Sequence, residues 1–238
     1  MPEWFEEWFG EEYLHLYPHR DSTDAERLVA LLGRAIPWQP GWTVLDVACG
    51  AGRHMAALER IPMRTFGLDL SQVLLLRARE VTVRPLVRAD MRALPLRAGR
   101  FDLAVNLFTS FGYFDSDNEH ADAMGQMIAV LRPAGWFAMD FLNATHVRQS
   151  LVPREQTRLA GAYVDIRREL SPDGRFVTKR IATGTGQTFV ERVRLLSAVE
   201  LEAMIRGAGA EVTGRFGDYD GGALGPGPRT ILVARRRS

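Results

Sequence analysis

The chain has 238 residues, of which 46% are hydrophobic and 25% charged, and its formal net charge is +1 at pH 7. This length suits one large α/β domain, or one such domain with an insertion, and the composition is that of a globular protein. The near-neutral charge gives no general attraction to nucleic acid or anionic lipid, and no apolar run is long enough to span a membrane. Cys49 is the single cysteine, which excludes an intrachain disulfide and a cysteine-cluster metal site.

The first 40 residues are predicted to be helical, and they begin without the basic region of a secretory leader, so we expect a cytoplasmic protein. Apolar residues recur at helical spacing behind Asp21-Ser22-Thr23, which can cap a helix, with Glu26 placed for a capping box. Pro37 and Pro40 end this helix. Upstream, aromatic side chains recur at roughly helical spacing: Trp4, Phe5, Trp8, Phe9, Tyr13 and Tyr17.

Short apolar strands then alternate with helices, which predicts a parallel sheet covered on both faces. The clearest helix is Asn118–Leu131, which we expect Pro133 and Gly135 to end. The predicted strands, of which the last two close the chain, are Thr43–Val47, Thr65–Leu68, Pro85–Arg88, Asp102–Leu107, Trp136–Phe141, Ala210–Phe216 and Thr230–Arg235.

The segment from about Thr157 to Leu195 follows a different pattern, in which apolar and polar residues alternate as in a half-buried strand. Ser171-Pro172-Asp173-Gly174 is a strong turn signal, and Gly184-Thr185-Gly186 is a second one. We therefore predict an antiparallel meander inserted after the fifth strand. A helix over Ser197–Arg206 follows it, with Ser197 and Glu200 at capping-box spacing.

The run Val44-Leu45-Asp46-Val47-Ala48-Cys49-Gly50-Ala51-Gly52-Arg53-His54 is an apolar strand that ends in an acid, followed by a glycine turn that opens a helix. Such a turn brings backbone amides and the positive end of a helix dipole against a ligand. In open α/β sheets, ligands bind at the carboxyl ends of the strands. A lone Gly-x-Gly is weak evidence, because many such loops need a glycine only to turn.

Two further acids follow the next strands, because Asp69 ends the second predicted strand and Asp90 ends the third. Parallel strands that finish at one edge bring these acids and Asp46 to a single crevice. A carboxylate at the second position can accept both hydroxyls of a ribose, and one at the third can accept the amino group of adenine. Each acid alone could merely cap a helix. Together with the glycine turn they predict a pocket for an adenosine that carries a polar tail.

At these positions the chain resembles the class I S-adenosylmethionine-dependent methyltransferases. The similarity covers most of residues 44–141, with weaker agreement over residues 197–236. The resemblance implies an α/β fold with a doubly wound, mostly parallel seven-stranded sheet, N-terminal helices and a small antiparallel insertion after strand five. The matching stretches are Leu45–Gly52, Gly67–Ser71, Ala89–Met91, Phe101–Ala104 and Leu131–Gly135.

The resemblance also implies which residues hold S-adenosylmethionine. Asp46 and the backbone of Gly50–Gly52 would frame its methionine part, Asp69 would bind the ribose, and Asp90 with Met91 would lie beside the adenine. The expected cofactor-binding residues are Asp46, Ala48, Cys49, Gly50, Gly52, Asp69, Leu70, Asp90, Met91, Asn106 (under the sulfonium) and Phe108, joined from the N-terminal segment by Tyr13 and Arg20.

A nicotinamide dinucleotide fold is the nearest alternative. It requires a third glycine for close packing of helix on sheet, where this chain has Met55. It also leaves Asp46 without a clear role. We therefore favour the methyltransferase interpretation.

The segment after the fourth strand, Asn106–Phe114, lacks the Asn/Asp-Pro-Pro-aromatic signature that nucleic-acid amino-methyltransferases often carry. It looks like a small-molecule subgroup that includes sugar N-methyltransferases, in which an insertion after strand five is also typical. We expect transfer of a methyl group to nitrogen or oxygen of a small-molecule acceptor, and a monomer or homodimer. An RNA or protein methyltransferase and a non-catalytic S-adenosylmethionine-binding protein remain open alternatives. Phe111 and Phe114 fit core packing and the substrate pocket equally well.

Three units are expected: an N-terminal helical lid (residues 1–40), the methyltransferase domain (residues 41–150 and 196–238) and the inserted subdomain (residues 151–195). Tyr13 and Arg20 of the lid could contact the cofactor, because an arginine can pair with its carboxylate. His54 follows the glycine turn in a helix and is interpreted as structural, and no metal-ligand spacing appears. The candidates for a catalytic base or orienting group are Tyr17, His19, His120 and His146.

Overall fold

A computed structural model describes residues 3–17, 22–159, 161–184 and 186–238. Within these ranges the helices are α1 (Trp4–Trp8), α2 (Glu11–Leu16), α3 (Ser22–Ala35), α4 (Arg53–Leu58), α5 (Gln72–Ala78), α6 (Asp117–Ala129), α7 (Ala144–Ser150) and α8 (Ala198–Gly207). The strands there are β1 (Thr43–Val47), β2 (Arg64–Asp69), β3 (Leu86–Arg88), β4 (Phe101–Asn106), β5 (Leu131–Leu142), β6 (Arg154–Leu159), β7 (Ala162–Leu170), β8 (Phe176–Thr183), β9 (Thr188–Arg194), β10 (Ala210–Phe216) and β11 (Arg229–Arg236).

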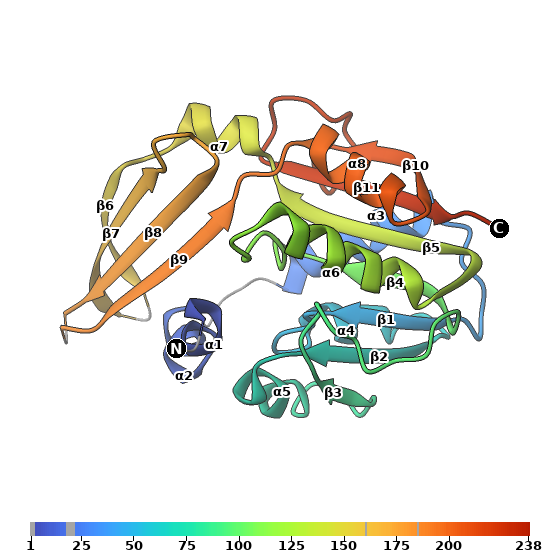
Figure 1. The fold of residues 1–238 in the computed structure, drawn as a ribbon. Helices are drawn as coiled ribbons and strands as arrows, with labels where there is room; N and C mark the ends of the chain where they lie inside the picture. Colours follow the sequence, from blue (N-terminus) through green and yellow to red (C-terminus); the bar gives the residue numbers. More distant parts are fainter. Residues whose placement is uncertain (1–2, 18–21, 160, 185) are drawn as a thin grey trace.

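The described strands form two sheets (Figure 1). The larger one has the order β10-β11-β5-β4-β1-β2-β3, and its neighbours from β5 to β3 run parallel, whereas β11 is antiparallel to both β5 and β10. The smaller one is the antiparallel meander β6-β7-β8-β9. The predicted fold class is therefore confirmed: a mostly parallel seven-stranded sheet with helices on both faces and a small antiparallel sheet inserted after β5.

Alternate residues of the central strands pack on opposite faces of the larger sheet, because successive side chains of a strand point to opposite sides. Val44 of β1 belongs to the apolar cluster that α3 and α4 form on one face. Its neighbour Leu45 belongs to the cluster on the other face, with α6 and α8. Such strands read as continuous apolar runs, which is why β1 could be recognised at its observed bounds.

The predicted end of the helix Asn118–Leu131 is wrong. α6 ends at Ala129, and Pro133 and Gly135 lie within β5 instead of ending the helix. The carbonyl of Val130 accepts hydrogen bonds from the N–H groups of Arg100 and Phe101, at 2.7 and 3.0 Å. The start of β4 thus fixes the chain just beyond the helix, and this is a tertiary contact that local periodicity does not reveal.

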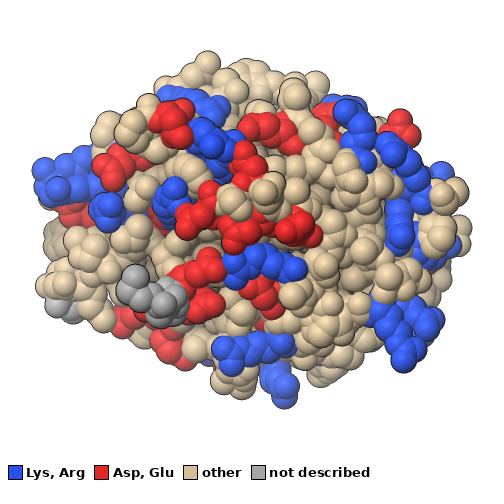
Figure 2. All heavy atoms as spheres, viewed as in Figure 1, with Lys and Arg blue, Asp and Glu red and all other residues tan. Residues whose placement is uncertain are grey.

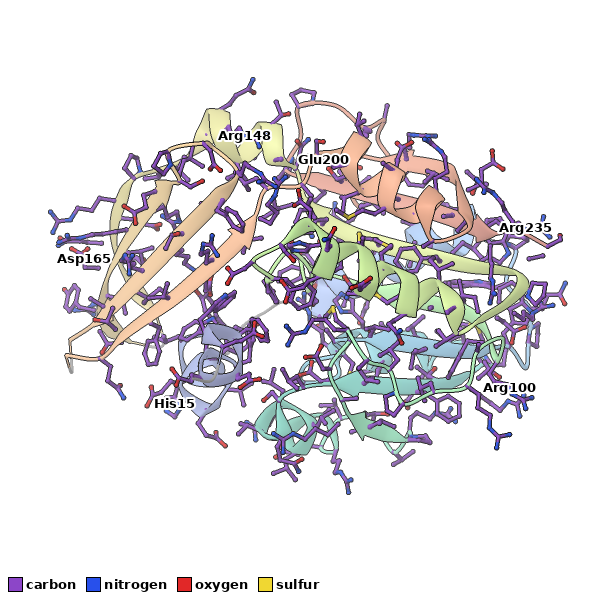
Figure 3. All side chains as sticks on the ribbon, in the orientation of Figure 1. His15, Arg100, Arg148, Asp165, Glu200 and Arg235 are labelled. Atoms are coloured by element: carbon purple, nitrogen blue, oxygen red, sulfur yellow. The ribbon has the colours of Figure 1, made fainter. Side chains whose placement is uncertain are left out.

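Helix α8 begins as predicted, with a capping box between Ser197 and Glu200. Glu200 also accepts a hydrogen bond at 2.8 Å from Arg194, the last residue of β9, whose side chain is buried. Arg148 of α7 reaches the same region and donates to the carbonyl of Leu195 (Figure 3). These contacts fasten the end of the smaller sheet to the larger one. The cap of α3 was expected within Asp21-Ser22-Thr23, but α3 already includes Ser22 and Thr23, so neither is its N-cap and a capping box from Thr23 to Glu26 is not formed, while Asp21 lies outside the described residues.

The N-terminal helices lie between the small sheet and α5 (Figure 1). Trp8 of α1 and Leu16 of α2 pack against Ile166 of β7 and Ile181 of β8. On the face shown in Figure 2, acidic and basic side chains are interspersed, with acids gathered near its centre and arginines toward both ends. No helix among the described residues is long and apolar enough to cross a membrane.

Candidate functional site

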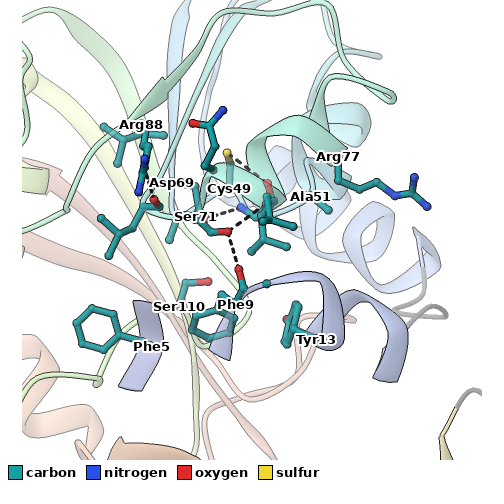
Figure 4. Close-up of a pocket in the computed structure, with 18 of the residues that line it drawn as sticks. Phe5, Phe9, Tyr13, Cys49, Ala51, Asp69, Ser71, Arg77, Arg88 and Ser110 are labelled. Carbon is teal, nitrogen blue, oxygen red and sulfur yellow. Dashed lines mark hydrogen bonds between the residues drawn. The ribbon is translucent and has the colours of Figure 1, made fainter. Parts of the chain in front are cut away.

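A cavity of about 750 Å³ lies at the carboxyl ends of β1, β2, β3 and β4, and α1 and α2 cover it (Figure 4). Its volume is in the range of sites that bind cofactors and small molecules. The expected cofactor residues that line it are Tyr13, Ala48, Cys49, Gly50, Asp69, Leu70, Asp90, Met91 and Phe108. Asp46, Gly52 and Asn106 are not among the lining residues, and Arg20 and His19 lie outside the described residues.

The glycine turn presents bare backbone to the cavity. Gly50 has a positive φ of 55°, and a Cβ added there would meet no atom within 4 Å, so the space above it is open. The Gly50 N–H donates a 2.8 Å hydrogen bond to Oδ2 of Asp69. The turn after β1 is therefore fixed to the end of β2, with room above it for a ligand.

Asp69 is a largely buried carboxylate at the cavity wall. Besides Gly50, it accepts a 2.8 Å hydrogen bond from the N–H of Ser71 through Oδ1. Burial raises the pKa of the Asp69 carboxyl, and the backbone N–H groups of Ser71 and Gly50 oppose that rise. Each carboxylate oxygen has a second lone-pair site, so both can still accept a hydroxyl from a ligand.

Asp46 lies next to Asp69 but is only 1% exposed. Burial and the charge of Asp69 raise the pKa of Asp46 to about 8, whereas Arg53 acts to lower it. Its Oδ2 has no hydrogen-bond partner among the described residues. A positively charged group bound nearby would lower the pKa of this buried carboxyl, because a cation stabilises its ionised form.

Met55 occupies the position where a dinucleotide fold has its third glycine, and it is completely buried. Its side chain packs with Cys49 and Leu75 over the glycine of the next strand, Gly67. A Cβ at Gly67 would collide with the Met55 sulfur and with Leu86. The missing side chain at Gly67 thus provides the space that Met55 takes up.

At the other end of the cavity, Arg92 donates two hydrogen bonds to Oδ2 of Asp90, from Nε at 3.0 Å and from Nη2 at 2.6 Å. Burial opposes ionisation of Asp90, but these hydrogen bonds outweigh it and lower the pKa of the carboxyl. Arg92 also donates to Glu3, just before α1, at 2.8 Å, and to Glu119 of α6 at 3.2 Å. The expected adenine end of the cavity is thereby tied to the N-terminal helices.

Asn106 at the end of β4 is fully buried, and its amide donates to the carbonyl of Val47 at 3.1 Å. It connects β4 to β1 from outside the cavity lining. Phe108, two residues on, does line the cavity, and the guanidinium of Arg53 lies 3.8 Å from the centre of its ring.

A buried charge network that sequence reasoning missed holds Phe108 in place. Asp140 of β5 accepts hydrogen bonds from the N–H of Phe108 at 3.1 Å, from the Tyr219 hydroxyl at 3.0 Å and from Arg229 at 2.8 Å. Phe108 and Thr109 both have positive φ, near 60°, which is strained for residues with a Cβ. An acid within the apolar run of β5 was the one available signal.

The N-terminal helices contact both sides of the site. Ser71 donates to the carbonyl of Phe9 at 2.5 Å, which fastens α1 to the start of α5 (Figure 4). Toward the small sheet, the Trp8 indole donates to Glu191 at 2.9 Å, and Lys179 donates to the hydroxyl of Tyr17. Tyr17, a candidate orienting group, lines the cavity, and its hydroxyl accepts a hydrogen bond from the ammonium group of Lys179.

The histidine candidates are placed differently from each other. His120 is fully buried among Phe111 and Phe114, and its Nδ1 lies 2.7 Å from the carbonyl oxygen of Ser116. His146 on α7 approaches the carbonyl of Pro226. Neither lines the cavity, whereas His54, interpreted as structural, does.

The two phenylalanines that fitted core packing and the substrate pocket equally well take different positions. Phe111 is in the core, and Phe114 reaches the cavity wall. Among the described residues, no group of three or more His, Cys, Asp or Glu side chains is placed to hold a metal ion.

Known proteins resemble the chain at the same region. A family described as a methyltransferase domain matches residues 44–135. The dTDP-3-amino-3,4,6-trideoxy-alpha-D-glucopyranose N,N-dimethyltransferase of Streptomyces venezuelae is 34% identical over 110 residues, 42% of this chain and 46% of that protein. An uncharacterized protein of Methanocaldococcus jannaschii is 24% identical over 174 residues, 73% of this chain and 63% of that protein. The matches thus span less than two thirds of either curated relative.

Solved structures match over nearly the whole chain. A sugar N-methyltransferase of Streptoalloteichus sp. ATCC 53650 has a TM-score of 0.72 and 26% identity, with 96% of this chain and 94% of that chain covered. An S-adenosylmethionine-dependent methyltransferase of Clostridium acetobutylicum ATCC 824 has a TM-score of 0.81 at 16% identity, covering 95% and 98%, and it shares the fold. With the glycine turn and the acids at the strand ends, these matches show that residues 44–135 form a methyltransferase domain and that the fold is the one of S-adenosylmethionine-dependent methyltransferases.

Proposed function

We propose that the protein transfers a methyl group from S-adenosylmethionine to the nitrogen of a small molecule of the amino-sugar class. One observation carries the proposal. The buried Asp69 carboxylate lies between the open glycine backbone and α5, in a cavity that α1 and α2 cover. Two relatives support the choice of acceptor: the Streptomyces venezuelae protein is named as an N,N-dimethyltransferase of an amino-sugar nucleotide, and the Streptoalloteichus protein as a sugar N-methyltransferase.

The residues present fit S-adenosylmethionine. Asp69 would accept the two ribose hydroxyls, Asp90 and Met91 would lie along the adenine, and the open backbone at Gly50 leaves room for the methionine part. Asp46, whose buried Oδ2 has no partner among the described residues, would stabilise the positive charge of the methionine part. When bound, S-adenosylmethionine supplies an electrophilic methyl group on a positively charged sulfur.

The protein's own contribution is to position the acceptor and exclude water. In the proposed reaction the nitrogen lone pair of the acceptor forms the new carbon–nitrogen bond. The carbon–sulfur bond breaks with its electron pair on sulfur, and the methylated ammonium then loses a proton to water. A neutral amine needs no general base for the transfer itself, which agrees with the placement of His120 and His146 away from the cavity.

Within the predicted unit of residues 1–40, helices α1 and α2 are proposed to act as the lid of this site, with residues 151–195 as the subdomain on which it rests, whereas α3 packs on the larger sheet. The contacts of Phe9 with Ser71 and of Trp8 with Glu191 support this division. A cytoplasmic location and a monomeric or dimeric state stay predictions from the sequence.

Isothermal titration calorimetry with S-adenosylmethionine and S-adenosylhomocysteine tests the proposal. The wild type should bind both, and Asp69→Ala should bind S-adenosylhomocysteine about 10- to 150-fold more weakly, because hydrogen bonds to a charged group contribute about 1.5–3 kcal/mol. Asp122→Ala, at an exposed acid of α6, is the matched control and should bind as the wild type does. A wild type that binds neither compound would refute the proposal.

Turnover is tested separately. Protein incubated with S-adenosylmethionine and dTDP-3-amino-3,4,6-trideoxy-alpha-D-glucopyranose should add 14 mass units to the sugar, about the mass of a methylene, whereas the matching 3-hydroxy sugar nucleotide should react slowly or not at all. Methylation of the hydroxy sugar alone would move the proposal to oxygen. Methylation of neither, by a protein that binds S-adenosylmethionine, would refute the amino-sugar class.

A further inference from the structure

His54 is a cavity residue whose ring makes no hydrogen bond to the described part of the protein. It lies in the first turn of α4, is 5% exposed and lines the cavity with its ring 6.5 Å from that of Phe108, measured between centroids. No hydrogen bond to its ring is found within the described residues 3–17, 22–159, 161–184 and 186–238. Its ring nitrogens are not among the fully buried polar atoms that lack a partner, so they are open to the cavity, where a ligand can supply the hydrogen bond that polar groups in protein interiors nearly always have.

His120 shows what a structural histidine of this chain looks like. Its ring is packed between Phe111 and Phe114, and Nδ1 approaches the Ser116 carbonyl within its own helix. His54 has aromatic packing on Phe108 but no such carbonyl. His120 has one ring nitrogen, Nε2, buried without a partner among the described residues and away from the cavity, whereas His54 lines the cavity, and this access separates packing from ligand binding.

The strand order assigns His54 to the half of the cavity opposite the nucleoside acids. Asp69 and Asp90 follow β2 and β3, at one edge of the sheet. Phe108, the ring that His54 contacts, follows β4 on the other side of β1 and is held by Asp140 of β5. A ligand whose ribose lies at Asp69 therefore points its reactive end toward the half that contains His54.

The charges around His54 keep its ring neutral. Burial, then the positive charges of Arg53 and Arg229, lower the pKa of His54 to about 3. A neutral imidazole carries its proton on one nitrogen, and the other nitrogen has a free lone pair that accepts a hydrogen bond; with its pKa lowered, the ring does not take up a second proton at neutral pH. Its chemistry here is to orient a donor rather than to remove a proton.

We propose that His54 binds the methyl acceptor, accepting a hydrogen bond from the N–H of its reacting nitrogen and so turning the nitrogen lone pair toward the methyl group. This inference rests on the proposed function. The nitrogen then attacks as described above, and the proton of the product leaves to water, not to His54. The guanidinium of Arg53 beside the ring disfavours an ammonium at this place, so the amine binds in its neutral form.

Two substitutions of different chemistry test the role. His54→Leu removes the acceptor atom, and His54→Gln keeps one on a side chain of similar length. With S-adenosylhomocysteine saturating, calorimetry should give a Kd for dTDP-3-amino-3,4,6-trideoxy-alpha-D-glucopyranose that rises about 5- to 100-fold in the leucine variant, since an N–H would be left buried and unpaired. The glutamine variant should stay within about 3-fold of wild type, and both should bind S-adenosylhomocysteine as wild type does.

A spectroscopic measurement adds a readout that a structural role would not move. In protein labelled with ¹⁵N-histidine, the His54 ring signals should shift when the amino sugar is added to the S-adenosylhomocysteine complex, and those of His120 should not. Unchanged amino-sugar affinity in His54→Leu, or a loss of S-adenosylhomocysteine affinity as large as that of Asp69→Ala, would overturn the inference alone. A wild type that binds S-adenosylhomocysteine but not the amino sugar would overturn the inference together with the proposed acceptor class.

Discussion

The hydroxyl of Ser71 donates a 2.5 Å hydrogen bond to the carbonyl oxygen of Phe9 and accepts one of 3.1 Å from the N–H of Leu74. A single side chain thus caps the N-terminus of α5 and holds the end of α1. Because Ser71 comes two residues after Asp69, the cover of the cavity is fastened beside the carboxylate expected to bind the ribose.

Ser71→Ala should weaken both functions of this hydroxyl. Loss of an N-cap serine costs about 0.5–2 kcal/mol of stability, and the released end of α1 should increase the rate at which S-adenosylhomocysteine dissociates. Ser71→Thr keeps the hydroxyl and should behave as wild type. Stopped-flow displacement and urea unfolding measure the two effects. Equal dissociation rates for Ser71→Ala and Ser71→Thr would show that α1 does not retain the ligand.

Asp46 should release a proton when a cation binds. Its pKa of about 8 leaves it mostly protonated at pH 7, and a positively charged ligand favours the ionised form. S-adenosylmethionine affinity should therefore rise as pH increases from about 6 to 8, and calorimetry in buffers of different ionisation enthalpy should detect up to about one proton released at pH 7.

Asp46→Asn is the control for this linkage. The variant should show no buffer dependence. Folding raises the pKa of Asp46, so the stability associated with its protonated form is present below about pH 4 and is lost as pH rises through about 8. Asp46→Asn should accordingly be at least as stable as wild type at pH 8, and proton release from the variant would assign the linkage to another group.

Removing the Asp140 carboxylate should destabilise the protein much more than removing the Tyr219 hydroxyl that donates to it. Asp140→Ala leaves Arg229 without its partner in a buried site, which costs about 3–5 kcal/mol. Tyr219→Phe removes one hydrogen bond and should cost about 1 kcal/mol. Urea unfolding measures both. Similar losses for the two variants would mean that Asp140 is not the centre of the network.

Trp8 should anchor the N-terminal helices mainly by packing. Its ring lies 4.7 Å from that of Phe189, between centroids, and the indole N–H donates to Glu191. Trp8→Phe keeps most of the packing, and hydrogen exchange in residues 4–16 should change little. Trp8→Ala removes a large buried side chain, a change that costs about 3–5 kcal/mol in a protein core, and exchange there should become fast. Equal exchange in both variants would contradict a packing role.

Elements whose cause is local could be predicted from the sequence. β1 was predicted at its observed bounds, because its signal is local: a threonine followed by four residues that are buried in the structure, between turn signals. The capping box of Ser197 and Glu200 is equally local, since both partners stand within one turn. The end of α6 was not, because Val130 is fixed by the backbone of β4, which no short window contains.

Two of the three acids at the strand ends line the cavity as expected, whereas Asp46 does not, and the partners of these acids were not foreseeable. Asp69 and Asp90 line the cavity and Asp46 lies buried beside it. That Arg92 would take the Asp90 carboxylate and also reach Glu3 depends on how α1 folds back over the sheet.

By itself, the sequence determined the fold class and predicted which residues form the cofactor half of the site. Strand periodicity, the glycine turn and the acid after each strand are local patterns, and parallel strands necessarily bring their carboxyl ends to one edge. The proposed acceptor half depends on the tertiary structure. It brings His54 of α4 to Phe108, which the sequence assigned to the cofactor, and to Asp140 of β5, and these residues act through burial and charge, which change the pKa of a side chain only when the chain has folded around it.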